Sequence, residues 1–482
     1  MKITDRTEGV LLGTAAGDAL GAAYEFKLPV PACEPVSMKR SHIWKAGQWT
    51  DDTSMAIAIA EVAARGEDLR GEAAQDTIVR RWHDWSLESP DVGVQTRTVL
   101  GRASRGGEIT AARAREESRR LHEEMGRTAG NGSLMRTSPV ALAYLHDEEA
   151  MVQAARALSD LTHADPLAGD ACVIWCSAIR HAVLTGEIDV RVGLHHLVPK
   201  RRAEWMAYLD EAEDSRPADF VNNGFVVQAL QGAWSAIYNT PEPDDDPLTA
   251  VFRADRLRRG LEAAVRGGRD ADTVAAIAGG LLGAAYGASA VPLHWRSMLN
   301  GWPDATARTL VQLASAIGRK GRPGPDLPYP DASERRWVCH PYDSEVVLGT
   351  AGVLRNLPPE ITAVVSMCRL RDSDIRTDMP HVEVRLIDKA DPQENPHLDF
   401  VLLQAVQAVE RLRADGHTVL IHCVGAVSRT PTLGALYGLR LKGVTADQAL
   451  DDLDAALDGF EPNPAFRAAL RRLEHLRPEG VA

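Results

Sequence analysis

The periodicity of the apolar residues changes once along the chain, at a stretch where a helix cannot continue. Residues 318–335 read GRKGRPGPDLPYPDASER, and the prolines in this stretch favour an extended segment. Before it, segments such as GVLLGTAAGDALGAAYEF and DTVAAIAGGLLGAAYG have the helical period. After it, short apolar runs such as ITAVVSMC, HVEVRLI and TVLIHC alternate with helical segments. We therefore expect a multidomain protein, with an all-α domain at 1–317, a Pro/Gly-rich linker at 318–334 and an α/β domain at 335–482.

The composition of the whole chain argues against several classes of protein. The formal net charge is −13 and no long Lys/Arg run is present, so the sequence does not support binding of nucleic acid by charge. The N-terminal MKITDRTEGV lacks the apolar core of a signal peptide, and no uninterrupted apolar run approaches the roughly 20 residues of a spanning helix. The six cysteines form neither a zinc ribbon nor a disulfide framework. We expect a cytoplasmic protein without a membrane partner, and the sequence gives no evidence for nucleic-acid binding.

Adjacent carboxylates stand at the start of an apolar helical segment in WTDDTSMAIAIA. Asp51 and Asp52 could cap this helix, because carboxylates accept hydrogen bonds from the free N–H groups of a first turn. They could instead bind a hard divalent cation such as Mg²⁺. Asp270 and Asp272 precede a second helix of small residues in the same way. If the two helix starts converge, a cation is needed to offset the repulsion among the four carboxylates. If they do not converge, each pair of acids is an independent cap of its own helix.

Five motifs in order along the helical half resemble the ADP-ribosylglycohydrolase family over roughly residues 7–317. They are GDALGAAYEF, WTDDTS, GNGSLMRTSPVAL, LTHADP and DADTVAAIAGGLLGAAYG. The resemblance implies an orthogonal helical bundle. It also implies a hydrolase that uses two Mg²⁺ ions, with Mn²⁺ as an alternative, to cleave the C1″ glycosidic bond of an ADP-ribosylated protein or small molecule.

The resemblance also assigns residues to this expected site. It places Glu25 near the glycosidic bond, with Asp52 and Asp272 as further catalytic residues. The implied metal ligands are Thr50, Asp51, Asp52, Asp270, Asp272 and Thr273, and the implied substrate-binding residues are Gly130, Asn131, Gly132, Ser133, Met135 and His163. A glycine-rich loop lets backbone N–H groups approach a diphosphate, which agrees with this assignment.

For three residues of the helical half, a purely structural role is an alternative to a role in the site. Asp18 is better explained as a cap or a buried hydrogen-bond partner than as a catalytic group. His163 fits ligand contact and structural hydrogen bonding equally well. Glu25 follows an apolar helical face and needs a partner there, so we expect it to orient substrate or transfer a proton.

A second constellation lies in the α/β half, in VLIHCVGAVSRT. Cys423 and Arg429 are separated by five residues between an apolar strand and a helical segment. This pattern resembles the cysteine-dependent dual-specificity or tyrosine phosphatases over roughly 335–482. In such a site the thiolate attacks phosphorus while loop N–H groups and the guanidinium surround the phosphate. We place Ser428 and Thr430 on the substrate-binding side, where the Thr430 hydroxyl could hydrogen-bond the thiolate.

Two features of this second site leave its activity open. The family has glycine three residues after the cysteine, where this chain has Ala426, so the loop could be altered. A phosphatase also needs an acid for the leaving oxygen, and the sequence offers Asp388 and Asp391. We favour Asp388, which directly follows an apolar strand, although both could be ordinary turn residues.

The leading interpretation is a metal-dependent ADP-ribosylglycohydrolase fused to a cysteine-dependent phosphatase domain that acts on a phosphorylated substrate. In a second interpretation the C-terminal domain is a non-catalytic phospho-binding module. In a third, the whole chain is a non-catalytic relative that binds ADP-ribose or phosphate.

Overall fold

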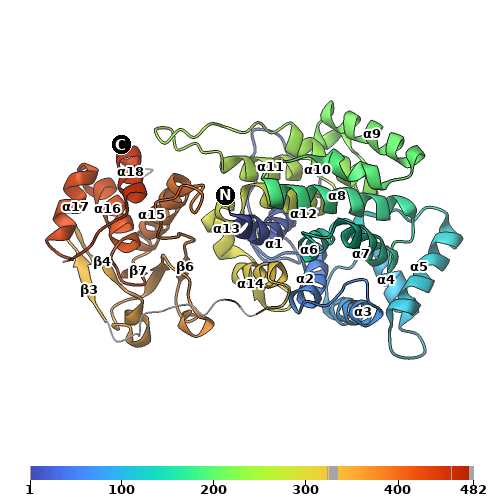
Figure 1. Ribbon diagram of the computed structural model, residues 1–482, viewed down its shortest axis with the longest axis horizontal. Helices are drawn as coiled ribbons and strands as arrows, with labels where there is room; N and C mark the ends of the chain where they lie inside the picture. The colour runs from blue at the N-terminus through green and yellow to red at the C-terminus, as the bar shows by residue number, and fades with distance from the viewer. Residues whose placement is uncertain (1, 323, 325–334, 458, 477–482) are drawn as a thin grey trace.

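The structure is a computed structural model that describes residues 2–322, 324, 335–457 and 459–476. Of the predicted linker at 318–334, residues 323 and 325–334 lie outside the described part. A helical domain precedes them and an α/β domain follows, as Figure 1 shows on the right and left. The multidomain fold class predicted from the change in periodicity is confirmed.

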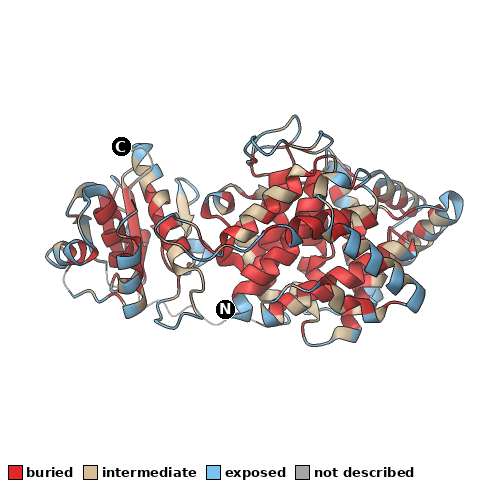
Figure 2. Ribbon diagram, turned by 90° about the horizontal axis from the view of Figure 1, so that it is seen from above, coloured by how far each residue is buried: buried red, intermediate tan, exposed pale blue. Residues whose placement is uncertain are grey.

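Helices form almost all of the regular structure of the first domain. They are α1 (Ile3–Gly21), α2 (Asp51–Ala64), α3 (Glu72–Glu88), α4 (Val94–Ala103), α5 (Ala111–Met125), α6 (Ser138–Ala143), α7 (Glu148–Asp160), α8 (Pro166–Thr185), α9 (Pro199–Glu213), α10 (Val226–Tyr238), α11 (Asp255–Arg266), α12 (Ala271–Tyr286), α13 (Leu293–Met298) and α14 (Ala307–Gly318). A short ribbon, β1 (Asn300–Gly301) with β2 (Ala305–Thr306), is a small departure from the predicted all-α domain. The helices at the centre of the domain are buried along most of their length (Figure 2).

Small residues let α1 and α12 touch along their backbones at the centre of this domain. A Cβ atom at Gly13 would lie 2.2 Å from the carbonyl oxygen of Gly279, and one at Gly279 would lie 2.0 Å from that of Gly13. Further along α1, a Cβ atom at Gly21 would lie 2.3 Å from the Cα atom of Asp272. Residue numbers rise along α1 as they fall along α12, so the pair is antiparallel. The end of α1 therefore meets the start of α12, where Asp272 lies.

One helix of this domain is long and apolar enough to cross a membrane by length and composition. It is α8, and 78% of its most apolar window is buried inside the structure. This burial is what we expect of a core helix in a packed domain.

The second domain is a five-stranded sheet with helices against it. The strand order is β3-β4-β7-β5-β6, with β3 antiparallel to β4 and the other pairs parallel. The strands are β3 (Trp337–His340), β4 (Asp343–Thr350), β5 (Ala363–Ser366), β6 (His381–Glu383) and β7 (Val419–Cys423), and the helices are α15 (Leu398–Ala414), α16 (Arg429–Lys442), α17 (Ala446–Asp454) and α18 (Pro464–Leu473). The sequence analysis missed β4, because its apolar run is short and begins among polar residues in DSEVVLGT.

Candidate active sites

The two acid-rich helix starts converge in the helical domain. Thr50, directly before α2, has its Oγ1 atom 3.0 Å from Oδ2 of Asp52 and 3.5 Å from Oδ2 of Asp272 at the start of α12. One oxygen each of Asp18, Asp52 and Asp272 lie within 4.8 Å of one another, and so do oxygens of Glu25, Asp270 and Asp272. The two groups share Asp272. Segments more than 200 residues apart in the chain thus build one acidic centre.

This arrangement raises the pKa of the carboxyl groups. Burial, and then the charges of Asp18, Asp91 and Asp270, raise the pKa of Asp51 to about 7. For Glu25, burial followed by the nearby Asp91 raises the pKa to about 8. The pKa values of Asp52 and Asp272 lie well above the ordinary range, again because of burial first and neighbouring carboxylates second. Proximity of like charges therefore disfavours ionisation unless a positive charge joins them.

The donor set fits a hard divalent cation. The Oδ1 atoms of Asp52 and Asp272 are buried and accept no hydrogen bond from the described residues. Buried carboxylate oxygens without a donor are costly, and a cation is the partner that they suit best. Thr50 contacts Asp51 as well as Asp52. Burial raises the pKa of Asp270, and a hydrogen bond from the Thr273 side chain partly opposes this rise. All six residues of the predicted ligand set thus lie at this centre.

Capping explains neither acid pair. The Asp51 and Asp52 side chains lie in the first turn of α2, and the N-cap residues Thr50 of α2 and Asp270 of α12 make no side-chain cap hydrogen bond. Asp18 on α1 instead accepts from the N–H groups of Thr50 (2.8 Å) and Thr53 (2.9 Å). A neighbouring helix thus supplies an acceptor at the start of α2, which favours cation binding over capping as the role of Asp51 and Asp52.

The predicted glycine-rich loop lies beside the acidic centre. Asn131 donates from Nδ2 to Oδ2 of Asp270 at 2.6 Å, which ties the loop to the start of α12. Its backbone N–H donates to the carbonyl oxygen of Gly224 (3.1 Å), so this N–H is already engaged within the protein. The His163 ring lies against the loop, since a Cβ atom at Gly132 would come within 3.0 Å of it.

Several predicted substrate-binding side chains are buried. His163 is 2% exposed and shares a 2.7 Å hydrogen bond with the Thr162 hydroxyl. The Ser133 hydroxyl accepts from that of Ser159 at 3.0 Å, and Met135 belongs to the hydrophobic core. These side chains support the loop from beneath, and Gly130 and Gly132 let its backbone lie close to His163.

Two residues of this centre were missed in the sequence. Asn223 accepts from the N–H of Asp270 (3.2 Å) and donates to the carbonyl oxygen of Gly268 (3.0 Å), so it fixes the turn before α12. Asp91 adds its charge to the environment of Glu25. Neither belongs to a motif, and each acts through contacts across the fold.

The second candidate site lies at the carboxyl end of the parallel strands. Cys423 ends β7 and is buried, and Arg429 begins α16. Arg429 donates from its Nη1 atom to the carbonyl oxygens of Met367 (3.0 Å) and Leu386 (3.2 Å), while its Nε atom is buried without a hydrogen-bond partner among the described residues. The strand–loop–helix arrangement predicted for the Cys-x₅-Arg pattern is therefore present.

Asp388 lies directly against this loop. Its Oδ1 atom accepts from the Ser428 hydroxyl (2.7 Å) and from Nδ2 of Asn463 (2.9 Å). Asp391 instead accepts from the backbone N–H of Gln393, two residues on, as a turn residue does. The geometry favours Asp388 over Asp391 as the acid, and Asn463, at the N-cap of α18, is a contact that the sequence analysis missed.

The loop departs from an unstrained conformation at one position. Ala426 has φ +53°, in the left-handed region where glycine is favoured, and it is buried. Thr430 is also buried, and its hydroxyl donates to the carbonyl oxygen of Gly349 in β4 at 3.5 Å. Alanine thus takes the backbone conformation that glycine adopts at lower cost.

A chain of hydrogen bonds behind Cys423 predicts acid sensitivity. The Ser366 hydroxyl lies 2.7 Å from Nε2 of His381 and 2.6 Å from Nε2 of His422, and Nδ1 of His381 accepts from the N–H of Arg376. Both rings must be neutral to keep these bonds. Burial lowers the pKa of His422 to about 3, with the nearby His381 as a second cause, and burial, then Arg308, lowers that of His381 to about 4.

We expect the free energy of unfolding of the α/β domain to fall as the pH falls below about 6.5. In this pH range both histidines are protonated in the unfolded chain but stay neutral in the folded domain. The free energy of unfolding therefore falls by about 2 kcal/mol for each histidine at pH 5. Calorimetric unfolding of the full chain at pH 5 and 7.5 measures this. His381→Gln should remove about half of the pH dependence, whereas the control His475→Gln should leave it unchanged. An undiminished pH dependence in His381→Gln would contradict this explanation.

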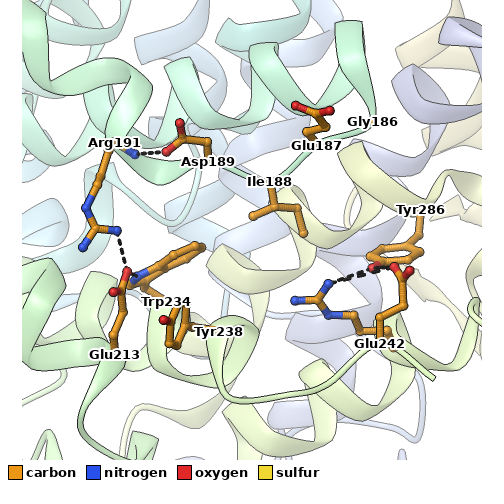
Figure 3. Close-up of a pocket in the computed structure, with 11 residues that line it drawn as sticks. Gly186, Glu187, Ile188, Asp189, Arg191, Glu213, Trp234, Tyr238, Glu242 and Tyr286 are labelled. Atoms are coloured by element: carbon orange, nitrogen blue, oxygen red, sulfur yellow. Dashed lines mark hydrogen bonds and ion pairs between the residues drawn. The ribbon is translucent and has the colours of Figure 1, made fainter.

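Two other clusters of polar residues lie outside these sites. Figure 3 shows a cavity of about 630 Å³ lined by Arg191, Glu213, Trp234 and Tyr286, among others. It lies at the far end of α12 from Asp272, roughly 21 Å away by helical rise. Glu148, His195 and His196 form the other cluster, where Arg180 already pairs with Glu148 at 3.1 Å. Neither cluster contains a residue that we assigned to a site from the sequence.

Comparisons with known proteins agree with this division of the chain. The family model of ADP-ribosylglycohydrolase matches residues 1–324, and that of the dual specificity phosphatase catalytic domain matches 358–475. The ADP-ribosylarginine hydrolase Tri1 of Pseudomonas putida is 31% identical, over 60% of this chain and 73% of the relative. The ADP-ribosyl-[dinitrogen reductase] glycohydrolase of Rhodospirillum rubrum is 28% identical over 65% and 97%. The human ADP-ribosylhydrolase ARH3 is 25% identical over 62% and 90%.

Solved structures resemble each half separately. An ADP-ribosylglycohydrolase-related protein complex has a TM-score of 0.48 at 28% identity, and covers 67% of this chain and 99% of its own. Human DUSP28 has a TM-score of 0.25 at 21% identity, over 27% of this chain and 88% of its own.

The fold and the two family models define a hydrolase class joined to a domain of phosphatase type. The family model covers two thirds of the residues, and the chain belongs to the ADP-ribosylglycohydrolase family. Its second domain is of the dual-specificity phosphatase type.

Proposed function

We propose that the helical domain removes ADP-ribose from an acceptor by hydrolysing the C1″ glycosidic bond. The observation that supports this most is that Asp272 belongs to two groups of carboxylates at once, one with Asp18 and Asp52 and one with Glu25 and Asp270. A centre with two adjacent cation positions would account for this arrangement.

Six residues would hold two Mg²⁺ or Mn²⁺ ions in this proposal. They are Thr50, Asp51, Asp52, Asp270, Asp272 and Thr273. When bound, the ions supply positive charge that orients the ribose hydroxyls and favours an attacking water molecule. The remaining steps belong to the residues of the chain.

The chain's own residues bind and orient the substrate. Asn131, fixed on Asp270, holds the glycine-rich loop where the diphosphate would lie, and Gly130 and Gly132 let this loop pack against His163. As the bond from C1″ to the acceptor breaks, positive charge develops on the ribose, and the partly buried Glu25 lies among the carboxylates that stabilise it. The bond from C1″ to the acceptor breaks as the acceptor takes a proton, for which Glu25 is our candidate donor. Water adds to C1″, and the proton that it loses returns to the Glu25 carboxylate.

The acceptor can be identified with two peptides. Arginine-linked and serine-linked ADP-ribosyl peptides, incubated with the protein and Mg²⁺ or Mn²⁺, should release free ADP-ribose from at least one linkage. The arginine linkage is our first choice, because the Pseudomonas putida relative is named as an ADP-ribosylarginine hydrolase. Release from neither peptide with either ion would contradict a protein acceptor of these two types.

We also propose that the α/β domain hydrolyses a phosphate monoester. The Cys423 thiolate attacks phosphorus and forms an S–P bond, the P–O bond to the leaving group breaks, and Asp388 gives its proton to the leaving oxygen. Water then cleaves the S–P bond, with the Asp388 carboxylate accepting a proton from it. The position of Asp388, 2.7 Å from the Ser428 hydroxyl in the phosphate loop, supports this assignment.

The left-handed backbone at Ala426 allows a test that distinguishes phosphate ester hydrolysis from phosphate binding alone. Ala426→Gly should relax the left-handed backbone, which costs roughly 1 kcal/mol for a residue with a side chain. We expect kcat for an aryl phosphate to rise about two- to fivefold. A phospho-binding module would instead show tighter phosphate binding and no turnover in either protein. Steady-state kinetics beside a phosphate-binding titration distinguish the two results.

A further inference from the structure

The segment that carries Asp388 lies between the two domains. Residues 384–397 connect β6 to α15, and the N-terminus of the chain lies beside the boundary between the domains (Figure 1). We propose that Arg385 is a positioning residue for the phosphatase reaction, through which the glycohydrolase domain holds Asp388 at the phosphate loop. This inference rests on the phosphatase function proposed above.

Arg385 joins this segment to the first helix of the other domain. Its Nε atom lies 2.9 Å from Oδ1 of Asp5, and its Nη1 atom pairs with Glu8, both on α1. The Ser315 hydroxyl on α14 donates to the same Glu8, and Arg369 lies 3.6 Å from it. The Glu8 side chain is only 1% exposed. Because the charges are buried, removing one partner leaves the other uncompensated.

The far end of the segment is also attached to the glycohydrolase domain. His397 donates from Nε2 to the carbonyl oxygen of Tyr286 at 2.9 Å, and Lys2 pairs with Glu394 at 2.5 Å. Just beyond, the Gln404 side chain on α15 accepts from the N–H of Leu293 at 2.9 Å. The segment is therefore held at both of its ends on the helical domain, and the adjoining α15 is held on α13.

Asp388 follows the first of these anchors by three residues. Later in the segment, Asn395 closes it into a loop. Its side chain accepts from the N–H of Ile387 (2.9 Å) and donates to the carbonyl oxygen of the same residue (2.8 Å). The path of the backbone into Asp388 is thus fixed from Arg385 on one side and Asn395 on the other. Ser428 and Asn463 orient the carboxylate only if this path brings it to them.

Loss of the Arg385 anchor should lower the fraction of molecules in which Asp388 can protonate the leaving oxygen. The expected signature is dependence on the leaving group. Phenyl phosphate releases a basic phenolate that needs the proton, whereas 2,4-dinitrophenyl phosphate releases an anion that does not. A merely structural defect would lower the rate for both substrates.

The test compares kcat/KM, which covers the steps up to release of the leaving group and not the later cleavage of the S–P bond, for the two substrates in full-length Arg385→Met and wild-type protein. We expect a loss of about tenfold or more with phenyl phosphate and less than about twofold with 2,4-dinitrophenyl phosphate. Arg385→Lys should restore most of the rate, and Glu8→Gln, in the other domain, should reproduce the same selectivity. Arg376→Met is the matched control, because the Arg376 side chain pairs with Asp378 of its own domain.

Two results would overturn the inference. One is an equal loss with both substrates in Arg385→Met, which indicates damage to the whole domain. The other is an unchanged rate with phenyl phosphate. Release of ADP-ribose by each variant reports that the helical domain is intact. Absence of turnover of either phosphate by the wild-type protein would overturn the phosphatase function itself, and the inference with it.

Discussion

Asp272→Asn should lower ADP-ribose release by at least about 10³-fold. Asp272 is the one carboxylate present in both groups of the acidic centre, so its charge would act on both cation positions. Loss of a group that acts on the reacting bond costs rates of this order. The measurement is the rate of ADP-ribose release at saturating Mg²⁺ or Mn²⁺, with Asp255→Asn as the matched control. Asp255 is a buried aspartate at the start of α11 that pairs with Arg258.

Asp272→Asn should lower activity but raise the stability of the metal-free protein. Without a divalent cation, Asp272→Asn removes one of several mutually repelling buried carboxylates, so the metal-free variant should unfold at a higher temperature than metal-free wild type. Added Mg²⁺ or Mn²⁺ should then stabilise wild type more than the variant. A variant that is inactive and also less stable without metal would point to a structural role for Asp272.

Cys423→Ser should abolish phosphate ester hydrolysis, with a fall of at least about 10³-fold, and leave ADP-ribose release unchanged. A hydroxyl at this position cannot replace the thiolate as the attacking group. Turnover of 2,4-dinitrophenyl phosphate and release of ADP-ribose are measured on the same preparation. Cys368→Ser, a buried cysteine of the same domain, is the control and should keep both activities.

The outcome also decides between catalysis and phosphate binding. If wild type turns over no phosphate ester and Cys423→Ser binds phosphate as wild type does, the C-terminal domain is a binding module. Retained turnover in Cys423→Ser would contradict Cys423 as the nucleophile.

The multidomain fold and the two acid-rich helix starts could be predicted from the sequence, for identifiable reasons. The change of apolar period separates the two domains, and the paired acids before α2 and α12 mark the two helix starts. What spacing could not show is that these starts meet. That depends on Gly13 and Gly279, which let α1 and α12 approach until their backbones touch.

Features that depend on contacts across the fold could not be predicted. Asp18, on another helix, accepts hydrogen bonds from N–H groups at the start of α2, and the local pattern around Asp51 and Asp52 could not show this. Asn223 and Asn463 hold their sites through hydrogen bonds to distant segments, and neither belongs to a motif. The pairing of Arg385 with α1 joins residues nearly 380 positions apart. Strand β4 was missed because its short apolar run could not be distinguished from a loop.

The central claim is that the acidic centre is a cation-dependent hydrolytic site. The most direct measurement is a titration of metal-free wild-type protein and Asp272→Asn with Mg²⁺ and Mn²⁺, with calorimetric binding and ADP-ribose release followed in the same samples. We predict that wild type binds two ions and that release rises with their occupancy, whereas the variant loses at least one binding event together with its activity. Release that proceeds undiminished in metal-free protein, or binding that is equal in both proteins, would contradict the claim.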